Sequence, residues 1–231
     1  MFNRELFTYD EETHSGFYDG KPIPSVTQLV DIIYPLDSDI PSDRLELAAE
    51  RGTKIHARVE EINCIFDKPP YYNGDYKKAL TKAIERALEM GMQETLDYVS
   101  ILSAYKLRPF DYENLIFLCD EQGELICYGH YDLVCQHEQD IDFANFREGQ
   151  LALFDVKTTS LFNKKKVGLQ ESIYALAYEQ CSKNYIANIL GLWLRDGVKV
   201  IPLERLDNKF VIALCKGLAK DWYDKRENIK D

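Results

Sequence analysis

An aspartate and a lysine end an apolar run in the second half of the chain, where residues 150–157 read QLALFDVK. Such a run predicts a buried strand over Gln150–Lys157. Side chains two positions apart on a strand point to the same face, so Asp155 and Lys157 are expected to lie together. They form either a salt bridge at a strand end or part of an active site. An Asp-x-Lys pair is common by itself, so its neighbours decide between the two.

A second aspartate, Asp132, lies in YGHYDLV on a strand predicted over 125–135, which one loop joins to the Asp155 strand. If these strands are neighbours, two carboxylates meet at one sheet edge and repel each other unless a cation lies between them. Mg²⁺ suits such a site because it takes carboxylate oxygens and keeps waters and substrate oxygens. The carbonyl of Val156 could add a ligand. Lys157 could then orient a nearby water or stabilise charge on a reacting phosphate.

Two predicted helices carry further polar pairs. His56 and Glu60 are four apart and therefore share a helix face, as do Gln170 and Tyr174. A histidine and a carboxylate can ligate a metal, and an amide with a phenol can hold the lysine, a water or a phosphate oxygen. Glu113, which opens a predicted strand, could supply another carboxylate. Each of these pairs also has a structural interpretation. His56 and Glu60 could be a solvated pair on a helix, or His56 a surface histidine, and Tyr174 could be a buried ring with a solvent-exposed hydroxyl.

The hydrophobic period changes along the chain from helical to strand-like and back, which predicts an α/β or α+β fold with helices around a mixed sheet. A long helix over 42–66 is expected to begin with a capping box of Asp43 and Glu46. Its expected apolar face is Leu45, Ala48, Ala49, Ile55, Val59 and Ile62. The other expected elements are a helix after the N-cap Ser25, one or two helices over 75–104 before Pro109, a hairpin of strands 112–119 and 125–135, a strand over 150–157, a helix over 167–183, a hairpin of 186–195 and 198–203, and a helix over 208–226.

We expect one domain over residues 1–231, a length that suits a single large domain. Its expected parts are an N-terminal segment 1–41, a helical part 42–109, a catalytic core 110–206 and a C-terminal helix 207–231.

The composition limits the class of protein. A formal net charge of −11 argues against a surface coated in positive potential, although a local basic groove stays compatible with it. The six cysteines form no CxxC pair, so a zinc site is not expected and reduced core thiols are. The start, MFNRELFTYDEE, has no apolar signal region, and no apolar stretch approaches the roughly 20 residues that span a bilayer. Neither export nor membrane insertion is expected.

Taken together, four motifs resemble the PD-(D/E)XK nuclease superfamily in its RecB-like and phage exonuclease-like branch, over roughly residues 20–180. The opening GKPIPSVTQLV also looks like the N-terminal segment of phage-encoded members. The four motifs are GTKIHARVE from Gly52 to Glu60, GHYD from Gly129 to Asp132, DVKTT from Asp155 and QESIY from Gln170 to Tyr174.

This resemblance implies a restriction-endonuclease-like αβββαβ core and hydrolysis of DNA phosphodiester bonds with Mg²⁺ or Mn²⁺. It makes His56, Asp132 and Asp155 metal ligands and Lys157 the catalytic lysine. The same resemblance assigns a supporting role to Gln170 and Tyr174. It matches Glu60 and Glu113 more loosely.

Departures from the family pattern restrict the cofactors. The second acid is Asp155, where many members have Glu. Only Cys181 and Cys215 follow the site, so the iron–sulfur cluster of some relatives is not expected. No GxxxxGK[ST] loop is present, so ATP use is not expected. The resemblance suggests DNA recombination, repair or processing of the phage type, in a bacterial or phage-infected cytoplasm. It also suggests a single-strand annealing protein or other recombination partner, and leaves an oligomer open.

Contacts with DNA have weaker sequence signals. Lys164, Lys165 and Lys166 follow the Asp155 strand and could contact backbone phosphates, or they could form a solvated loop. Tyr71 and Tyr72 could stack on unpaired bases, although simple loop exposure is the more ordinary reading. The favoured function is an exonuclease, with endonuclease action left open. The alternatives are a catalytically silent nuclease fold that binds DNA or protein, and a metal-dependent hydrolase of RNA or nucleotides.

Overall fold

The computed structural model describes residues 1–35, 41–67, 73–195 and 197–227. Helices and strands alternate along these ranges in the mixed manner that the sequence predicted. The helices are α1 (Val26–Ile33), α2 (Ser42–Asn63), α3 (Tyr76–Met90), α4 (Gln93–Ala104), α5 (Lys164–Ser182) and α6 (Asn208–Glu227), with short 3-10 turns η1 (Arg4–Leu6), η2 (Cys64–Phe66) and η3 (Phe143–Asn145). The strands are β1 (Phe7–Asp10), β2 (Ser15–Tyr18), β3 (Lys21–Ile23), β4 (Leu107–Tyr112), β5 (Leu115–Cys119), β6 (Leu125–His130), β7 (Leu133–His137), β8 (Leu151–Lys157), β9 (Ile186–Leu194) and β10 (Val198–Pro202).

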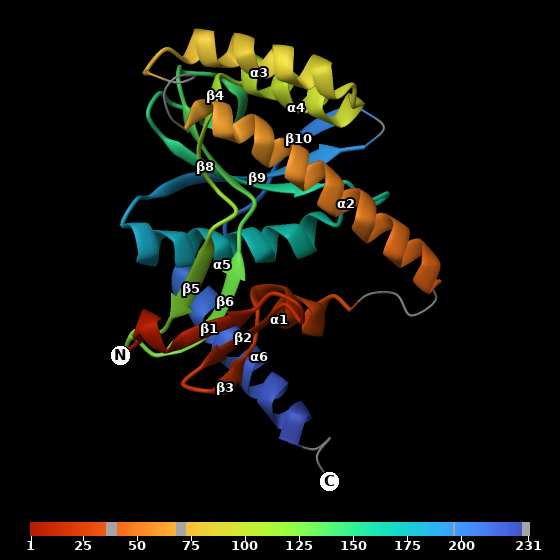
Figure 1. Cartoon of the computed structure of the whole chain (residues 1–231). Coiled ribbons are helices and arrows are strands. Elements are labelled where there is room, and N and C mark those ends of the chain that lie inside the picture. The colour runs from red at the N-terminus through yellow and green to blue at the C-terminus, as the bar shows by residue number, and fades with distance from the viewer. Residues whose placement is uncertain (36–40, 68–72, 196, 228–231) are drawn as a thin grey trace.

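A five-stranded mixed sheet in the order β10-β9-β8-β7-β4 forms the centre of the fold. Strands β8 and β9 are parallel and joined by α5, whereas the other neighbouring pairs are antiparallel. Helices α2, α3 and α4 cover one face of this sheet, and α5 covers the other (Figure 1). The prediction of a mixed sheet with flanking helices is therefore confirmed. The elements α2, β4, β7, β8, α5 and β9 follow one another in the αβββαβ order that the resemblance implies, with α3 and α4 inserted after α2 and the β5–β6 pair inserted between β4 and β7.

Strand β8 is apolar on both faces because helices cover the sheet on both sides. Ala152, Phe154 and Val156 pack into the cluster beneath α2, α3 and α4. Leu151 and Leu153 pack into the opposite cluster with α5. Asp155 and Lys157 continue the row of Leu151 and Leu153, so the two charges lie on the α5 face, as their spacing predicted.

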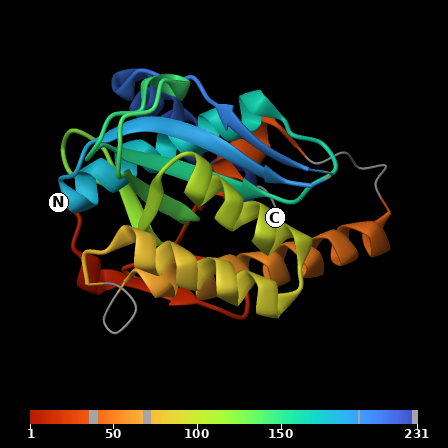
Figure 2. The same cartoon turned by 90° about the horizontal axis from the view of Figure 1, so that it is seen from above.

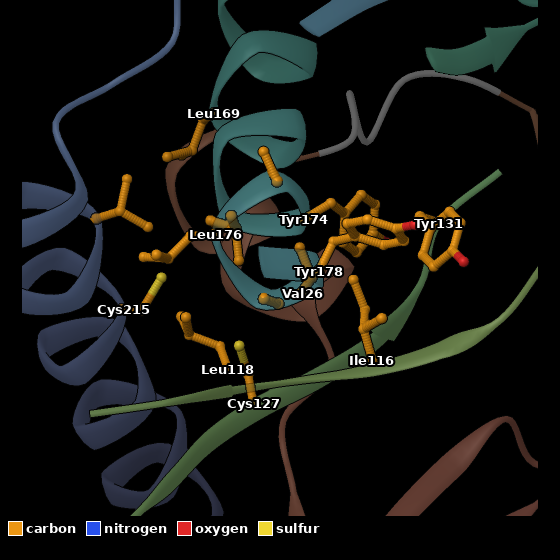
Figure 3. Packing of buried hydrophobic residues seen from close by; sticks show 14 of the residues in the cluster. Val26, Ile116, Leu118, Cys127, Tyr131, Leu169, Tyr174, Leu176, Tyr178 and Cys215 are labelled. Atoms are coloured by element: carbon orange, nitrogen blue, oxygen red, sulfur yellow. The ribbon is translucent and has the colours of Figure 1, made fainter. Parts of the chain in front are cut away.

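A second group of elements lies below α5 in Figure 1 and holds the strands that lead to Asp132. The antiparallel pair β5–β6 packs on α5 and α6, and the three-stranded sheet β1-β2-β3 lies against this pair. Figure 3 shows Leu118 and Cys127 of these strands facing Cys215 of α6, with Tyr174 and Tyr178 of α5 directed towards Tyr131.

Some predicted elements were confirmed closely. Ser25 caps α1 through a capping box with Gln28, and β8 covers 151–157. The expected helix over 75–104 is the pair α3 and α4, which lie side by side in Figure 2. The two expected hairpins are β5–β6 and β9–β10, both antiparallel.

Other expectations were wrong. Pro109 does not end the helical part but lies within β4, so the sheet begins before residue 110. The strand expected over 125–135 is two strands, β6 and β7, separated at Tyr131 and Asp132. The N-terminal sheet β1-β2-β3 was not expected. Lys164–Lys166 form the first turn of α5 and not a loop.

Helix α2 also begins differently from the prediction. Pro41 occupies its N-cap without a side-chain hydrogen bond, so Asp43 and Glu46 form no capping box. Residues 42–50 are exposed, and the buried face consists of Ile55, Val59 and Ile62. The first half of α2 therefore projects past the sheet (Figure 1). No helix of the described ranges is long and apolar enough to cross a membrane.

Candidate metal centre and lysine site

The break between β6 and β7 leaves the backbone of β8 unpaired at Val156 on the β7 side. The β7–β8 ladder ends at the pair Leu133 and Phe154, so Val156 has no strand partner on that side. Its N–H donates instead to Oδ2 of Asp132 at 2.6 Å. Two carboxylates, Asp132 and Asp155, are thereby held at the same end of neighbouring strands, as the sequence predicted.

His56 reaches the same end of β8 from α2. Its Nε2 lies 3.1 Å from the carbonyl oxygen of Val156, and its Nδ1 lies 3.4 Å from Oε1 of Glu113 and 3.8 Å from Oδ1 of Asp132. One ligand atom from each of His56, Glu113 and Asp132 lies within 4.8 Å of the other two. These atoms could converge on one cation.

Glu113 is held at this place by its backbone. It follows β4 in the turn before β5, with a φ of 49° in the left-handed region, and its N–H donates to the carbonyl oxygen of Asp132 at 3.2 Å. The expectation that Glu113 opens a strand is therefore wrong, since the turn residue precedes Leu115. A left-handed glutamate is uncommon and persists only where its surroundings hold it.

The carboxylates change the protonation of His56. Burial lowers the pKa of this imidazole, but the hydrogen bond to Glu113 and the charges of Asp132 and Glu113 outweigh burial and raise the pKa to about 9. His56 is therefore an imidazolium at neutral pH in the metal-free protein. A cation that uses a nitrogen of His56 must displace a proton, because a metal ligand has to be neutral imidazole.

Asp155 and Lys157 form an ion pair of 2.5 Å between Oδ1 and Nζ. The Asp155 side chain is only 1% exposed, and its Oδ2 has no hydrogen-bond partner among the described residues. Burial lowers the pKa of Lys157, but the charges of Asp155 and Asp132 raise it above the usual lysine range. Lys157 is therefore a cation and a hydrogen-bond donor in the metal-free protein.

Gln170 and Tyr174 lie on α5, one turn apart. Nε2 of Gln170 donates to the hydroxyl of Tyr174 over 3.5 Å, which is a long contact. Tyr174 is buried against Gly129, where an added Cβ would lie 2.6 Å from its ring. Burial raises the pKa of Tyr174 above the usual tyrosine range, so its hydroxyl stays protonated. The GHYD motif thus owes its glycine to the close approach of this ring.

One charged residue was missed by the sequence reasoning. Glu171 is 1% exposed, and neither of its carboxylate oxygens has a hydrogen-bond partner among the described residues. Helical spacing could have found it, because Val167, Glu171, Tyr174 and Tyr178 are separated by four, three and four positions and are all buried. Glu171 thus occupies a core position.

The remaining predicted residues are not part of the cluster of His56, Glu113 and Asp132. Glu60 is exposed and lines a surface pocket with Glu113. Lys164 and Lys165 are exposed, whereas Nζ of Lys166 is 2.6 Å from Oδ1 of Asp31. Tyr71 and Tyr72 lie outside the described residues.

No model of a known protein family matches the chain, and no curated protein matches it at a significant level. The chemistry of the site must therefore be argued from its own geometry.

The donor set fits a divalent metal ion. Mg²⁺ and Mn²⁺ take oxygen ligands at roughly 2 Å, so ligands on opposite sides of one ion lie about 4 Å apart. The mutual distances of His56, Glu113 and Asp132, all within 4.8 Å, are close to this requirement. The unpartnered Oδ2 of Asp155 offers a further buried oxygen. The side chains of His56, Glu113 and Asp132 are 29%, 35% and 19% exposed respectively, so a cation can reach them from solvent.

Proposed function

We propose that this protein is a metal-dependent DNA nuclease that hydrolyses phosphodiester bonds, acting as an exonuclease. One observation carries the proposal: a cluster of metal-ligating atoms adjoins a buried acid–lysine pair at the same end of neighbouring strands. A structural salt bridge needs only the pair. The added histidine and carboxylates are the residue types that ligate divalent cations, and a structural salt bridge does not require them.

In this proposal Asp132, Asp155 and His56 hold Mg²⁺ or Mn²⁺, with the Val156 carbonyl and Glu113 as further oxygen donors. When bound, the ion supplies positive charge that offsets the negative charge gathering on the phosphate during displacement. The Val156 N–H fixes the carboxylate of Asp132, so that one of its oxygens is oriented before the ion arrives. This ordering reduces the free energy needed to assemble the site.

Lys157 contributes charge and orientation. Its ammonium can donate to a phosphate oxygen or to the attacking water. Its side chain is 28% exposed, so the ammonium is within reach of a bound substrate. Gln170, which lies partly exposed on α5, can hold a water or a phosphate oxygen beside it.

The wider role that we propose rests on the resemblance to phage-type PD-(D/E)XK exonucleases. It is DNA recombination, repair or processing in a bacterial or phage-infected cytoplasm, with a single-strand annealing protein or other recombination protein as partner. Lys164 and Lys165, exposed on the first turn of α5, would contact the DNA backbone.

The test is a time course of cleavage of end-labelled linear DNA and closed circular DNA with Mg²⁺, Mn²⁺ or EDTA. The wild type is compared with Asp155→Ala and Lys157→Ala, and with Lys220→Ala on the exposed face of α6 as a matched control. We expect metal-dependent loss of linear DNA, retained in the control and reduced at least about a hundredfold in both site variants. Cleavage of the circles would make the protein an endonuclease.

A wild type that cleaves neither DNA with any metal would contradict the proposal. In that case competition with RNA would test for a hydrolase of another nucleic acid. If RNA were also spared, a silent nuclease fold that binds DNA or protein would be the better description.

A further inference from the structure

A row of three side chains crosses the sheet from Lys157 to the edge strand β10. Lys157 of β8 is the partner of Trp193 in the parallel register of β9, and Trp193 is the partner of Lys199 in the antiparallel register of β10. Paired residues on neighbouring strands point to the same face, so all three lie on the α5 face of the sheet. Leu192 and Val200, which alternate with them, pack on the opposite face. An aromatic ring thus lies between two lysines, one of which belongs to the proposed active site.

The ring of Trp193 is held by the turn that follows β8. Its Nε1 donates to the carbonyl oxygen of Thr159 at 2.7 Å. The ring of Phe162 lies beside it, with a centroid distance of 6.1 Å and an interplanar angle of 43°. Phe162 itself packs closely on Gly191 of β9, which has no Cβ to keep the ring away. Trp193 is nevertheless only partly buried, so the turn and β9 together hold a fixed aromatic surface one strand away from Lys157.

An exposed lysine lies over this ring. Nζ of Lys199 is 4.7 Å from the centroid of the Trp193 ring, and Lys199 is exposed. A cation–π contact at an exposed site is weak, and a lysine side chain can move away from the ring. A nucleic-acid base is a flat group that stacks on an aromatic ring more strongly than an exposed ammonium binds to it. The displaced ammonium would then meet the phosphates of the same strand.

We propose that Trp193 and Lys199 form a subsite for an unpaired DNA strand, beside the phosphate that Lys157 meets. This inference rests on the proposed function and extends it. One base of the strand stacks on Trp193, and the ammonium of Lys199 leaves the ring and binds a backbone phosphate. The strand therefore runs from β8 across β9 towards β10. Bases in a duplex already stack on one another, so the subsite favours an unpaired strand over a duplex.

The second tryptophan of the chain makes the test specific, because the sequence contains only two. Trp222 lies on α6, which extends away from the five-stranded sheet (Figure 1). Its ring also carries a cation, since Cζ of Arg226 is 4.5 Å from the ring centroid. Trp222→Phe leaves Trp193 as the indole that emits, and Trp193→Phe leaves Trp222. The two variants therefore compare two tryptophans that each lie under a cation.

The experiment follows tryptophan fluorescence during titration with a thymidine oligonucleotide, in EDTA so that the strand is not cut. We expect the oligonucleotide to quench Trp193 in Trp222→Phe, because a stacked base quenches an indole. Closed circular duplex DNA and an abasic oligonucleotide of the same length should quench it far less. The emission of Trp222 in Trp193→Phe should stay unchanged. Equal quenching by the abasic strand would show that no base stacks, and would overturn the inference.

Fluorescence anisotropy of a labelled oligonucleotide measures the affinities. Trp193→Leu should weaken binding about tenfold, because leucine offers no flat ring, whereas Trp193→Phe should retain most of the affinity. Tyr185→Leu is the matched control: the ring of Tyr185 is 70% exposed before the other end of β9 and has Arg205 over it, 5.6 Å from its centroid. This variant should bind like the wild type. Lys199→Gln should lower the magnitude of the salt dependence by about one counterion.

The outcomes separate this inference from the proposed function. No quenching of Trp193, in a protein that cleaves DNA, would overturn the inference alone. Quenching in a protein that cleaves neither DNA nor RNA would support the subsite and overturn the proposed nuclease activity. Weaker binding by Trp193→Leu without any quenching would mean that Trp193 only packs the turn, which also overturns the inference. Thermal unfolding checks that each variant folds, and the quenching of Trp193 decides even if Trp193→Leu does not.

Discussion

The carbonyl oxygen of Val156 lies 3.1 Å from Nε2 of His56, although the two residues are 100 positions apart in the chain. Val156 is available for this contact because β7 begins only at Leu133 and leaves the end of β8 unpaired on that side. The same backbone unit donates its N–H to Asp132. A single residue of β8 therefore orients both a helix histidine and a turn aspartate.

The raised pKa of His56 makes the stability of the metal-free protein depend on pH. The folded-state pKa is about 9, above the ordinary value of 6.5, so the folded protein binds this proton more tightly than the unfolded chain. The stabilisation is fully present below pH 6.5 and is lost as the pH rises to about 9. We expect the free energy of unfolding to fall by about 3 kcal/mol over this window. Urea unfolding in EDTA at several pH values measures it.

His56→Gln is the control for this prediction. Glutamine keeps a hydrogen-bond donor but has no proton to lose, so its stability should change less over the same pH range. Parallel pH profiles for the two proteins would show that another group is responsible.

Asp132→Asn tests the metal centre without removing the contact to β8. The amide oxygen can still accept the N–H of Val156, so the variant should fold, but the charge that attracts the cation is gone. We expect Mn²⁺ affinity to fall at least about tenfold, measured by calorimetry or by the electron paramagnetic resonance signal of free Mn²⁺. Binding equal to that of the wild type would remove Asp132 from the ligand set.

Gly129→Ala tests the close packing of β6 on Tyr174. The added Cβ would lie 2.6 Å from the Tyr174 ring, and we expect a loss of about 2 kcal/mol in the free energy of unfolding. Gly217→Ala on α6 is the matched control, since its added Cβ meets nothing within 4 Å. In a helix this change should stabilise by up to about 1 kcal/mol. Equal effects at the two glycines would contradict the packing.

Of the three lysines at the start of α5, we expect Lys164 and Lys165 to bind DNA and Lys166 to stabilise the fold. Lys164 and Lys165 are exposed, so replacing both with Ala should weaken DNA binding and lower the magnitude of its salt dependence by about two counterions. Lys166 is engaged with Asp31, so Lys166→Ala should leave the salt dependence unchanged and reduce stability by about 0.5 kcal/mol. Fluorescence anisotropy at several salt concentrations distinguishes them. A salt dependence lowered only by Lys166→Ala would reverse the assignment.

The parts of the site predicted from the sequence were those with local signals. The apolar run before Asp155 and Lys157 sufficed to identify β8 and the shared face of the two charges, because a strand alternates strictly. The helical spacing around Ile55 and Val59 located His56 on α2. The neighbourhood of Asp132 and Asp155 followed from the single loop that joins their strands.

The parts that were missed depend on contacts distant in sequence. Pro109 suggested an end, yet β4 is an edge strand with a bulge between Pro109 and Asp111, where a missing N–H is tolerated. The division into β6 and β7 at Asp132 follows Gly129, but a single glycine is also compatible with an unbroken strand. A lone glutamate between Gln170 and Ser172 looks like a solvent-facing residue until the sheet covers it. The exposed Leu45 shows the reverse case, an apolar position that no neighbour covers among the described residues.

The projecting half of α2 has a mechanical consequence for the site. An α-helix is a stiff rod that rises about 1.5 Å per residue, so Ser42 lies about 21 Å along the axis from His56. The far end lies in solvent, whereas the near end carries the imidazole that touches β8. A load at the tip would turn the rod about its buried segment at Ile55 and Val59 and swing the imidazole relative to the carboxylates. A change in the tilt of α2 would thus change the distances within the proposed metal site.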